Sequence, residues 1–489
     1  MTTPATEDPE AAPPGSAKKA TLGAQVGLFI DMFDVYLPII ALAPAAMYFQ
    51  PDGLSDGQGR LLTSAIFAAT LLGRPLGALI FGSISDRHGR RRTTIFSLVG
   101  FGLCTLIIGV LPGYQAVGML AIIALIALRF LDGIFLGGQY TAATPLALEQ
   151  SPKERRGFNG ALIMTGFPTA YCAIALLTYV LLLAIPSGSH DSEYTQWGWR
   201  IPFLIGGAMA LAWAFWYSRH VDESDAWIAN KPKESSVSPV VELLRGDNLR
   251  GFLQVFVLMS GIWMAFNMVG AVLPATLRAQ GGLNDTQATM VLVIAYAMLV
   301  PGYLVAGSLG QRFGRRRFFL VQGPLTAVVA PFLFWLIASR SIDGVVAIAL
   351  TTVALVGTVV SVYSVASTYI IERFHVGVRS SGYGLGYTTA VILPAFYATY
   401  QSGLGNLMPY EYTPLVLICL GGLLILIGAV VGPETKHVDL GAPKAQNRDD
   451  AKYLAGSIVG LPYSETSDQE PESDAAGTPR HPENPGERA

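Results

Sequence analysis

Apolar runs of about 20 residues recur along most of this 489-residue chain, and each is long enough for a helix to cross a lipid bilayer. The chain is 52% hydrophobic and only 13% charged, which is too little charge to cover the surface of a soluble protein of this length. The sequence therefore predicts an all-α membrane protein that passes through the bilayer many times.

Run lengths and helix breakers predict twelve transmembrane helices. Their expected limits are 22–48, 61–85, 94–112, 117–148, 157–185, 198–218, 251–277, 287–310, 318–338, 343–371, 381–404 and 411–432. A loop sequence at Gly82–Arg91 recurs in weaker form 225 residues later at Gly307–Arg316, each time between two apolar spans. Such an internal repeat indicates two similar six-helix bundles joined in one chain, which is how secondary transporters are built.

Basic residues mark alternate connections between these spans, and the asymmetry keeps its phase along the whole chain. Because positively charged loops remain in the cytoplasm, we expect both termini to be cytoplasmic and the protein to lie in the inner or plasma membrane. The polar stretch 219–250 is the expected cytoplasmic linker between bundles at 20–218 and 251–435. Residues 1–19 and 436–489 are polar and Pro-rich, and we expect them to be disordered tails.

Charged residues inside the spans are the best candidates for function, because a charge is costly to bury in a bilayer. The first half holds nearly all of them: Asp31, Asp34, Arg74, Arg129 and Asp132, with Glu149 at the inner end of the fourth span. The polar residues in the middle of the second-half spans are neutral. We therefore expect the first bundle to handle protons and charge, and the second to offer hydrogen bonds and aromatic walls.

Asp31 and Asp34 are three residues apart and share a helix face. Two close carboxylates in a low-dielectric site repel one another, so one of them should titrate toward neutral pH and can carry a proton. The alternative is that one or both neutralise Arg74 or Arg129 in fixed ion pairs. We favour a proton site for at least one of the two.

Arg129 and Asp132 are also three residues apart on one helix. They form either a local pair that holds the bundle together or a switchable pair, in which Arg129 turns to Asp34 or to an anionic substrate. A guanidinium is always charged and can hold a carboxylate with two hydrogen bonds. Both alternatives stay open at this stage.

The Gly82–Arg91 loop is expected to form a gate rather than to bind substrate. Asp86 can lie at the N-terminal end of a neighbouring helix, and the arginines can pair with acidic groups such as Glu149. The alternative is that the loop only fixes orientation. The expected cytoplasmic gate residues are Gly82, Asp86, Arg87, Gly89, Arg90, Arg91, Glu149, Arg312, Gly314 and Arg315.

The spacing Gly-x-x-x-Asp-Arg-x-Gly-Arg-Arg at 82–91 resembles the most specific motif of the major facilitator superfamily, and the resemblance covers roughly residues 20–436. Within this range, Arg74–Gly77, Arg129–Gly133 and Arg379–Tyr387 resemble the metabolite:proton symporter family. Pro433–Lys436 resembles the related sugar porters. The resemblance implies a major facilitator fold, alternating access about a cavity lined by spans one, four, seven and ten, and symport of a small metabolite with a proton.

In that family the first span reads acidic-x-aromatic-Asp, and Asp31-Met32-Phe33-Asp34 matches it. The match makes Asp34 the preferred proton-coupling residue, with Asp31 beside it. The chain differs where the family often has Gln, at Asp132, and where it often has Glu, at Gln139. Gln311 replaces the motif Asp in the second loop. The residues expected to pair charges or bind substrate in the cavity are Arg129, Asp132, Arg74, Gln139, Asn267, Tyr296, Tyr363 and Tyr387.

The sequence thus predicts a proton-coupled symporter that imports a small polar metabolite, such as an organic acid, and needs no cofactor beyond the proton gradient. Its expected partners are the substrate, protons and the lipid bilayer, without nucleic acid, and we expect a monomer. A proton-driven exporter is the alternative, disfavoured because Gly166–Thr169 lacks the glycine-rich Gly-Pro pattern of drug antiporters. A non-transporting receptor is less favoured still. An enzyme is disfavoured because no metal-ligand cluster, nucleophile–base pair or nucleotide loop appears.

Overall fold

The computed structural model describes residues 16–51, 56–229 and 238–441, and every regular element within these ranges is helical. The first half contains α1 (Ser16–Tyr36), α2 (Asp56–His88), α3 (Arg90–Gly109), α4 (Tyr114–Val117), α5 (Met119–Glu149), α6 (Arg156–Met164), α7 (Gly166–Ala184) and α8 (Arg200–His220). Two short helices follow, α9 (Asp225–Ala229) and α10 (Pro239–Leu243).

The second half contains α11 (Gly246–Asn267), α12 (Leu273–Ala279), α13 (Asp285–Phe313), α14 (Arg315–Pro324), α15 (Ala330–Ala338), α16 (Val345–Val360), α17 (Tyr363–Arg373), α18 (Arg379–Thr388), α19 (Ile392–Ala395), α20 (Tyr397–Leu404) and α21 (Thr413–Val431). Short π-helical turns (Leu37–Ala41, Tyr194–Gly198, Met268–Val272, Leu325–Val329) and 3₁₀ segments (Ala43–Phe49, Lys153–Arg155, Thr389–Val391, Tyr410–Tyr412) extend or connect them.

All twelve predicted spans coincide with long helical segments. Ten segments of the described residues are long and apolar enough to cross a membrane, and the other two predicted spans correspond to α2 and to the broken segment α18–α20. Three boundaries differ from expectation. α1 begins at Ser16, so residues 16–19 are helical, and α11 begins at Gly246 inside the expected linker. Residues 436–441, expected to be part of a disordered tail, pack against the protein, with Leu440 only 1% exposed. The remaining tail residues, 1–15 and 442–489, lie outside the described residues.

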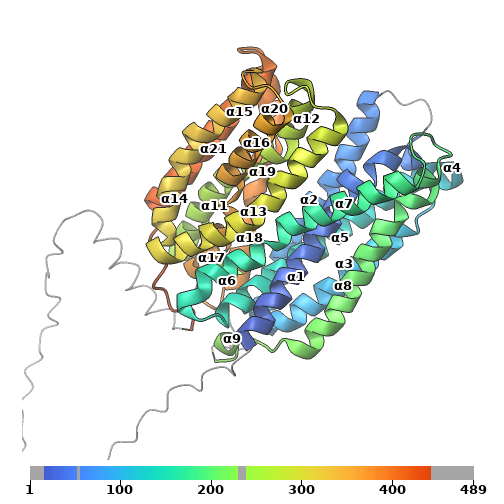
Figure 1. Cartoon of the computed structure of the whole chain (residues 1–489). Helices are drawn as coiled ribbons and strands as arrows, with labels where there is room; N and C mark the ends of the chain where they lie inside the picture. The colour runs from blue at the N-terminus through green and yellow to red at the C-terminus, as the bar shows by residue number, and fades with distance from the viewer. Residues whose placement is uncertain (1–15, 52–55, 230–237, 442–489) are drawn as a thin grey trace, which may run out of the picture.

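The two halves lie side by side, the first in blue to green and the second in yellow-green to red (Figure 1). The loops at 87–92 and 312–317 lie at the same end of the molecule, which we call the basic end. The halves meet there through α18, which packs on α2 and α5, and through α6, which packs on α13 and α17.

Close contact between α2 and α5 positions the charged residues of the first half. Gly73 and Gly77 of α2 face Gly133 and Gly137 of α5, and a Cβ at any of the four would overlap backbone atoms of the opposite helix. Small residues of this kind allow membrane helices to approach closely. The approach brings the α2 segment around Arg74 directly against the part of α5 that carries the other buried charges.

Candidate functional site

Asp31 and Arg74 form a buried ion pair between α1 and α2. Asp31 is 0% and Arg74 5% exposed, and Arg74 Nη2 donates to Asp31 Oδ1. Tyr140 of α5 lies beside the guanidinium, with 5.8 Å between Arg74 Cζ and the ring centroid. Within the described structure, Asp31 Oδ2 has no hydrogen-bond donor. The pair therefore keeps one acceptor available for a further donor.

Asp34, one turn further along α1, pairs with Arg129 of α5. Arg129 Nη1 donates to Asp34 Oδ2 at 3.1 Å, and Nη2 donates to the Asp34 carbonyl oxygen at 3.1 Å. The Thr105 hydroxyl of α3 donates to Asp34 Oδ1 at 2.6 Å. Both carboxylate oxygens of Asp34 thus accept hydrogen bonds from described donors.

Asp132 lies one turn after Arg129 on α5 and is 0% exposed. Its Oδ2 lies 3.1 Å from Arg129 Nη1, close enough for an ion pair. The Arg129 guanidinium is not aligned for a hydrogen bond to this carboxylate, however, and neither Asp132 oxygen accepts a hydrogen bond from any described residue. The two alternatives for Arg129 therefore coexist, because it contacts Asp34 and Asp132 at the same time.

Aromatic rings connect this charged region to the neutral second half. Tyr140 contacts Tyr387 of α18 with 5.4 Å between ring centroids, and Tyr387 contacts Trp263 of α11 at 5.6 Å. Trp263 in turn contacts Tyr363 of α17 at 5.5 Å. We call these four residues the central aromatic cluster. Since Tyr140 also lies beside Arg74, the cluster joins a cation of the first half to aromatic walls of the second.

Gln139 and Tyr363 bring unsatisfied polar atoms to this region. Gln139 is 0% exposed, and neither of its amide atoms has a hydrogen-bond partner among the described residues. The Tyr363 hydroxyl, also buried, has none there either. Buried polar groups are normally hydrogen-bonded, so unsatisfied ones near a charge cluster are candidates to bind a ligand.

Asn267 and Tyr296, also expected in the cavity, have other partners. Asn267 Nδ2 donates to the Pro394 carbonyl oxygen at 2.9 Å, which satisfies the broken helix at α19. Tyr296 of α13 stacks on Tyr171 of α7, with 4.2 Å between ring centroids, where the two halves meet. These contacts place Asn267 at a helix break and Tyr296 at the interface between halves.

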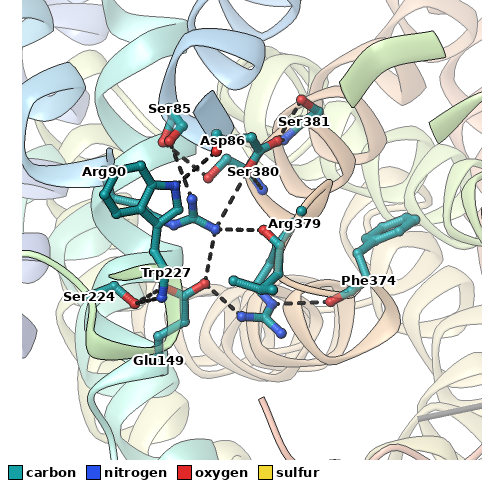
Figure 2. Close-up of polar contacts among 12 residues, drawn as sticks. Ser85, Asp86, Arg90, Glu149, Ser224, Trp227, Phe374, Arg379, Ser380 and Ser381 are labelled. Atoms are coloured by element: carbon teal, nitrogen blue, oxygen red, sulfur yellow. Dashed lines mark hydrogen bonds and ion pairs between the residues drawn. The ribbon is translucent and has the colours of Figure 1, made fainter. Parts of the chain in front are cut away.

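At the basic end, Asp86 and Glu149 of the first half bind the start of α18 (Figure 2). Arg90 Nη2 donates to the Val376 carbonyl oxygen, just before that helix, at 2.8 Å. Asp86 Oδ1 accepts from Ser380 N at 3.0 Å, and Oδ2 accepts from Ser381 N at 2.9 Å and from the Ser381 hydroxyl at 2.7 Å. The carboxylate thus caps the N-terminus of α18, where helix N–H groups favour an anion.

Glu149 is the centre of the same network. It accepts from Arg379 Nη1 at 2.6 Å and from Arg90 Nη2 at 3.2 Å, and the Ser224 hydroxyl also donates to it. Trp227 of α9 covers the site and donates from Nε1 to the Asp86 carbonyl oxygen at 2.8 Å (Figure 2). We call this set, Asp86, Arg90, Glu149, Arg379, Ser380 and Ser381, the first gate network.

A second network repeats this arrangement with the halves exchanged. Glu372 of α17 accepts from Arg315 Nη2 at 3.1 Å and from Arg156 Nη1 at 3.5 Å. Gln311, which stands where the repeated motif has Asp86, accepts from Gly157 N at 2.8 Å through its side-chain oxygen. We call Arg156, Gln311, Arg315 and Glu372 the second gate network. An uncharged Gln311 makes fewer bonds across the interface than Asp86 does.

Two further carboxylates hold the repeated loops. Glu223 accepts from the backbone N–H groups of Arg90 and Arg91, and Glu434 accepts from those of Arg315 and Arg316. Each caps the start of a helix, α3 or α14. Gly89 and Gly314 precede these helices with φ of 108° and 102°, a backbone conformation that side chains disfavour, which explains why the motif needs glycine there.

The other expected gate residues have separate positions. Gly82 packs against the Ser381 backbone, and Arg91 donates to the Val221 carbonyl oxygen at 2.6 Å at the end of α8. Arg87 and Arg312 are exposed. Sequence reasoning did not select Glu372, although it lies 223 residues after Glu149, close to the repeat offset. It also did not select Arg156, Arg379, Glu223, Glu434 or Thr105 as site residues.

The segment after the last helix lies across both networks. Arg156 of the first half donates to the Val438 carbonyl oxygen at 2.9 Å, and Arg379 of the second half donates to the Leu440 carbonyl oxygen at 2.9 Å. The Thr435 hydroxyl donates to Glu372 at 2.7 Å. In the part of the chain that the structure describes, no three His, Cys, Asp or Glu residues gather as metal ligands.

Comparison with known proteins places this geometry in a family. The model of the Major Facilitator Superfamily matches residues 26–396. The inner membrane metabolite transport protein YhjE of Escherichia coli (strain K12) is 29% identical over 449 residues, covering 88% of this chain and 97% of that protein. The shikimate transporter of the same strain is 29% identical over 395 residues, covering 77% and 85%.

The alpha-ketoglutarate permease of that strain is 28% identical over 377 residues, covering 76% of this chain and 83% of the permease. Among solved structures, the proton:xylose symporter XylE bound to 6-bromo-6-deoxy-D-glucose aligns with a TM-score of 0.71 at 18% identity, covering 88% of this chain and 99% of XylE. At that identity the likeness concerns the fold.

Proposed function

The chain belongs to the major facilitator superfamily and is a multi-pass transporter of the cell membrane rather than an enzyme, and we propose that it couples uptake of a small carboxylate metabolite to protons. The observation that carries this proposal is the buried cluster in which three carboxylates, Asp31, Asp34 and Asp132, face only two guanidinium groups. Such intramembrane charges are typical of proton and substrate pathways.

Proton uptake by this cluster weakens its hold on Arg74 or Arg129. The guanidinium that is released can then bind a substrate carboxylate with two hydrogen bonds. The central aromatic cluster lies beside Arg74 and offers rings for the body of the substrate, and Gln139 and Tyr363 offer hydrogen bonds. Shikimate and alpha-ketoglutarate, named for two relatives, are both carboxylates.

After substrate has bound, the two gate networks control its release from the protein. We place the basic end at the cytoplasm, because it carries the Arg-rich loops. With both networks formed, that end is closed, and inward release of substrate requires Glu149 and Glu372 to part from the arginines of the opposite half. Rocking of the two bundles about a central site is how transporters with internal repeats alternate access.

The test is uptake of labelled organic acids, amino acids and sugars by the purified protein in proteoliposomes under an imposed pH gradient. Accumulation of organic acids inside vesicles with an alkaline lumen, collapsed by a protonophore, is the expected result. Efflux driven by the same gradient would identify an exporter instead. Uptake that reaches only equilibrium, with or without the gradient, would contradict proton coupling.

A further inference from the structure

Asp132 differs from every other carboxylate in the buried ion pairs. Six carboxylate side chains in the described ion pairs are at most 1% exposed: Asp31, Asp34, Asp86, Asp132, Glu149 and Glu372. Five of them accept hydrogen bonds from described donors. Asp132 accepts none from any described residue. A buried, ionised carboxylate without donors is costly, whereas a protonated carboxyl group needs only one acceptor.

The acceptor for such a proton is close by. Asp34 Oδ2 and Asp132 Oδ2 each lie 3.1 Å from the same Arg129 Nη1, so the two oxygens are within about 6 Å of one another. Two ionised carboxylates cannot hydrogen-bond to each other, but a carboxyl group can donate to a carboxylate. Asp34 already has donors on both oxygens, so we take Asp34 as the acceptor of the hydrogen bond and Asp132 as its donor.

The charges around Asp132 also require one proton. Asp31 and Asp34 on α1 and Asp132 itself give three negative charges, against Arg74 on α2 and Arg129 on α5. The other side chains around this cluster carry no charge: Tyr36 on α1, Thr70 on α2, Cys104 and Thr105 on α3, Tyr140 on α5, and Tyr383 and Tyr387 on α18. A single proton makes the cluster neutral, which removes the cost of an unpaired buried charge.

We propose that Asp132 holds the coupled proton in this closed state and donates it, as a hydrogen bond, to the ionised carboxylate of Asp34. This rests on the proposed proton-coupled function and assigns its proton to a residue on α5 rather than to Asp34. On release, the proton passes to water, and the Asp132 carboxylate that remains competes with Asp34 for Arg129. Asp34 thus orients the carboxyl proton of Asp132, and Arg129 changes its ion pairs when that proton leaves.

Infrared difference spectroscopy of the purified full-length protein tests this directly. Spectra at neutral and alkaline pH should show the carbonyl stretch of one buried protonated carboxyl group that disappears as pH rises. Asp132→Asn should remove the band, and Asp132→Glu should shift it, because the band then belongs to a different side chain. Asp31→Glu leaves the proposed hydrogen bond in place, so it is the matched control and should leave the frequency unchanged. Asp34→Glu alters only the acceptor of that hydrogen bond and should shift the band less than Asp132→Glu does. Glutamate substitutions are needed because Asp34→Asn, like Asp132→Asn, makes the cluster neutral without a proton. Either asparagine variant would therefore remove the band, whichever residue holds the proton.

A band that shifts more with Asp34→Glu than with Asp132→Glu, or that shifts with Asp31→Glu, would overturn the proposal, as would wild-type protein with no such band. Thermal melting and gel filtration check that each variant is folded. If the Asp132 variants fail to fold, a wild-type spectrum without the band, or a shift of the band with Asp31→Glu, would still overturn the proposal. The band requires no transport. If the band belongs to Asp132 but the protein shows no proton-driven uptake, the proposed function is contradicted. If uptake occurs and the band belongs to Asp34, only the assignment of the proton to Asp132 is contradicted.

Discussion

The side chain of Arg129 connects three helices of the first half. It donates to Asp34 of α1, to the Thr70 hydroxyl of α2 at 3.0 Å, and contacts Asp132 of its own helix. Because a guanidinium has fixed donor geometry, it cannot follow one partner without changing its contact with the others. A change of charge on either carboxylate is therefore transmitted to α2 as well.

Asp34→Asn is expected to abolish proton-driven accumulation of substrate while leaving membrane insertion intact. The variant makes the cluster neutral without a proton, so a pH gradient no longer has a group to act on. The measurement is uptake into proteoliposomes with and without the gradient. Exchange of labelled for unlabelled substrate at equal pH serves as the control, since it needs no net proton movement. Full gradient-driven uptake by the variant would contradict the role of this residue.

At the residue scale, the sequence identified the charges better than their partners. Asp31, Asp34, Arg74, Arg129 and Asp132 could be selected because charge inside an apolar run is rare. Which carboxylate meets which arginine depends on the crossing of helices and could not be read from spacing. Thr70 and Thr105 were missed because a hydroxyl in a membrane helix usually bonds its own backbone and gives no distinctive signal.

At the scale of elements, the contact between α2 and α5 depends on four glycines. Gly77→Ala is expected to destabilise the protein by about 1–3 kcal/mol, because its Cβ would overlap the Ile134 carbonyl and force the helices apart. Thermal melting in detergent measures the effect. Gly302→Ala in α13 is the matched control, since no atom lies within 4 Å of its added Cβ. Similar melting temperatures for both variants would contradict the packing argument.

The segment at 436–441 is an ordered element that its amino-acid composition did not predict. Its polar sequence predicted disorder, but the pairing of its carbonyl groups with Arg156 and Arg379 and the burial of Leu440 hold it in place. Those partners become available only when α6 and α18 come together, so no local pattern could reveal them. The repeat itself was visible in sequence, because both copies keep the glycine that the helix start requires.

Leu440→Asp is expected to lower stability by about 1–3 kcal/mol, because it places a charge in a buried position and displaces the carbonyl group that Arg379 uses. The melting temperature in detergent is again the readout. Asp439→Asn changes the neighbouring, exposed residue and should have little effect. If both substitutions behave alike, the segment is not bound at the basic end.

At the scale of the whole molecule, the two halves are joined at the basic end by two related but unequal networks. Asp86 accepts three bonds from the start of α18, while Gln311 makes two bonds to the first half, accepting from Gly157 N and donating to the Lys153 carbonyl oxygen. Each network has one buried glutamate that binds an arginine of its own half and an arginine of the other. We therefore expect the proposed closed state to depend on Glu149 and Glu372 together.

Neutralising both glutamates should therefore open the basic end. Removing one partner of a buried ion pair costs about 3–5 kcal/mol, and about 1.4 kcal/mol changes a population ratio tenfold. Spin labels on cysteines introduced at the exposed positions Arg92 and Arg317, one in each half, report the separation once Cys104, Cys172 and Cys419 are replaced. In nanodiscs, Glu149→Gln with Glu372→Gln should add a longer-distance population that either single variant shows less strongly. Arg87→Gln, an exposed change in the same motif, should leave the distances as they are. An unchanged distribution in the double variant would mean that these networks fix orientation and packing without controlling access, because the closed state would then persist without them.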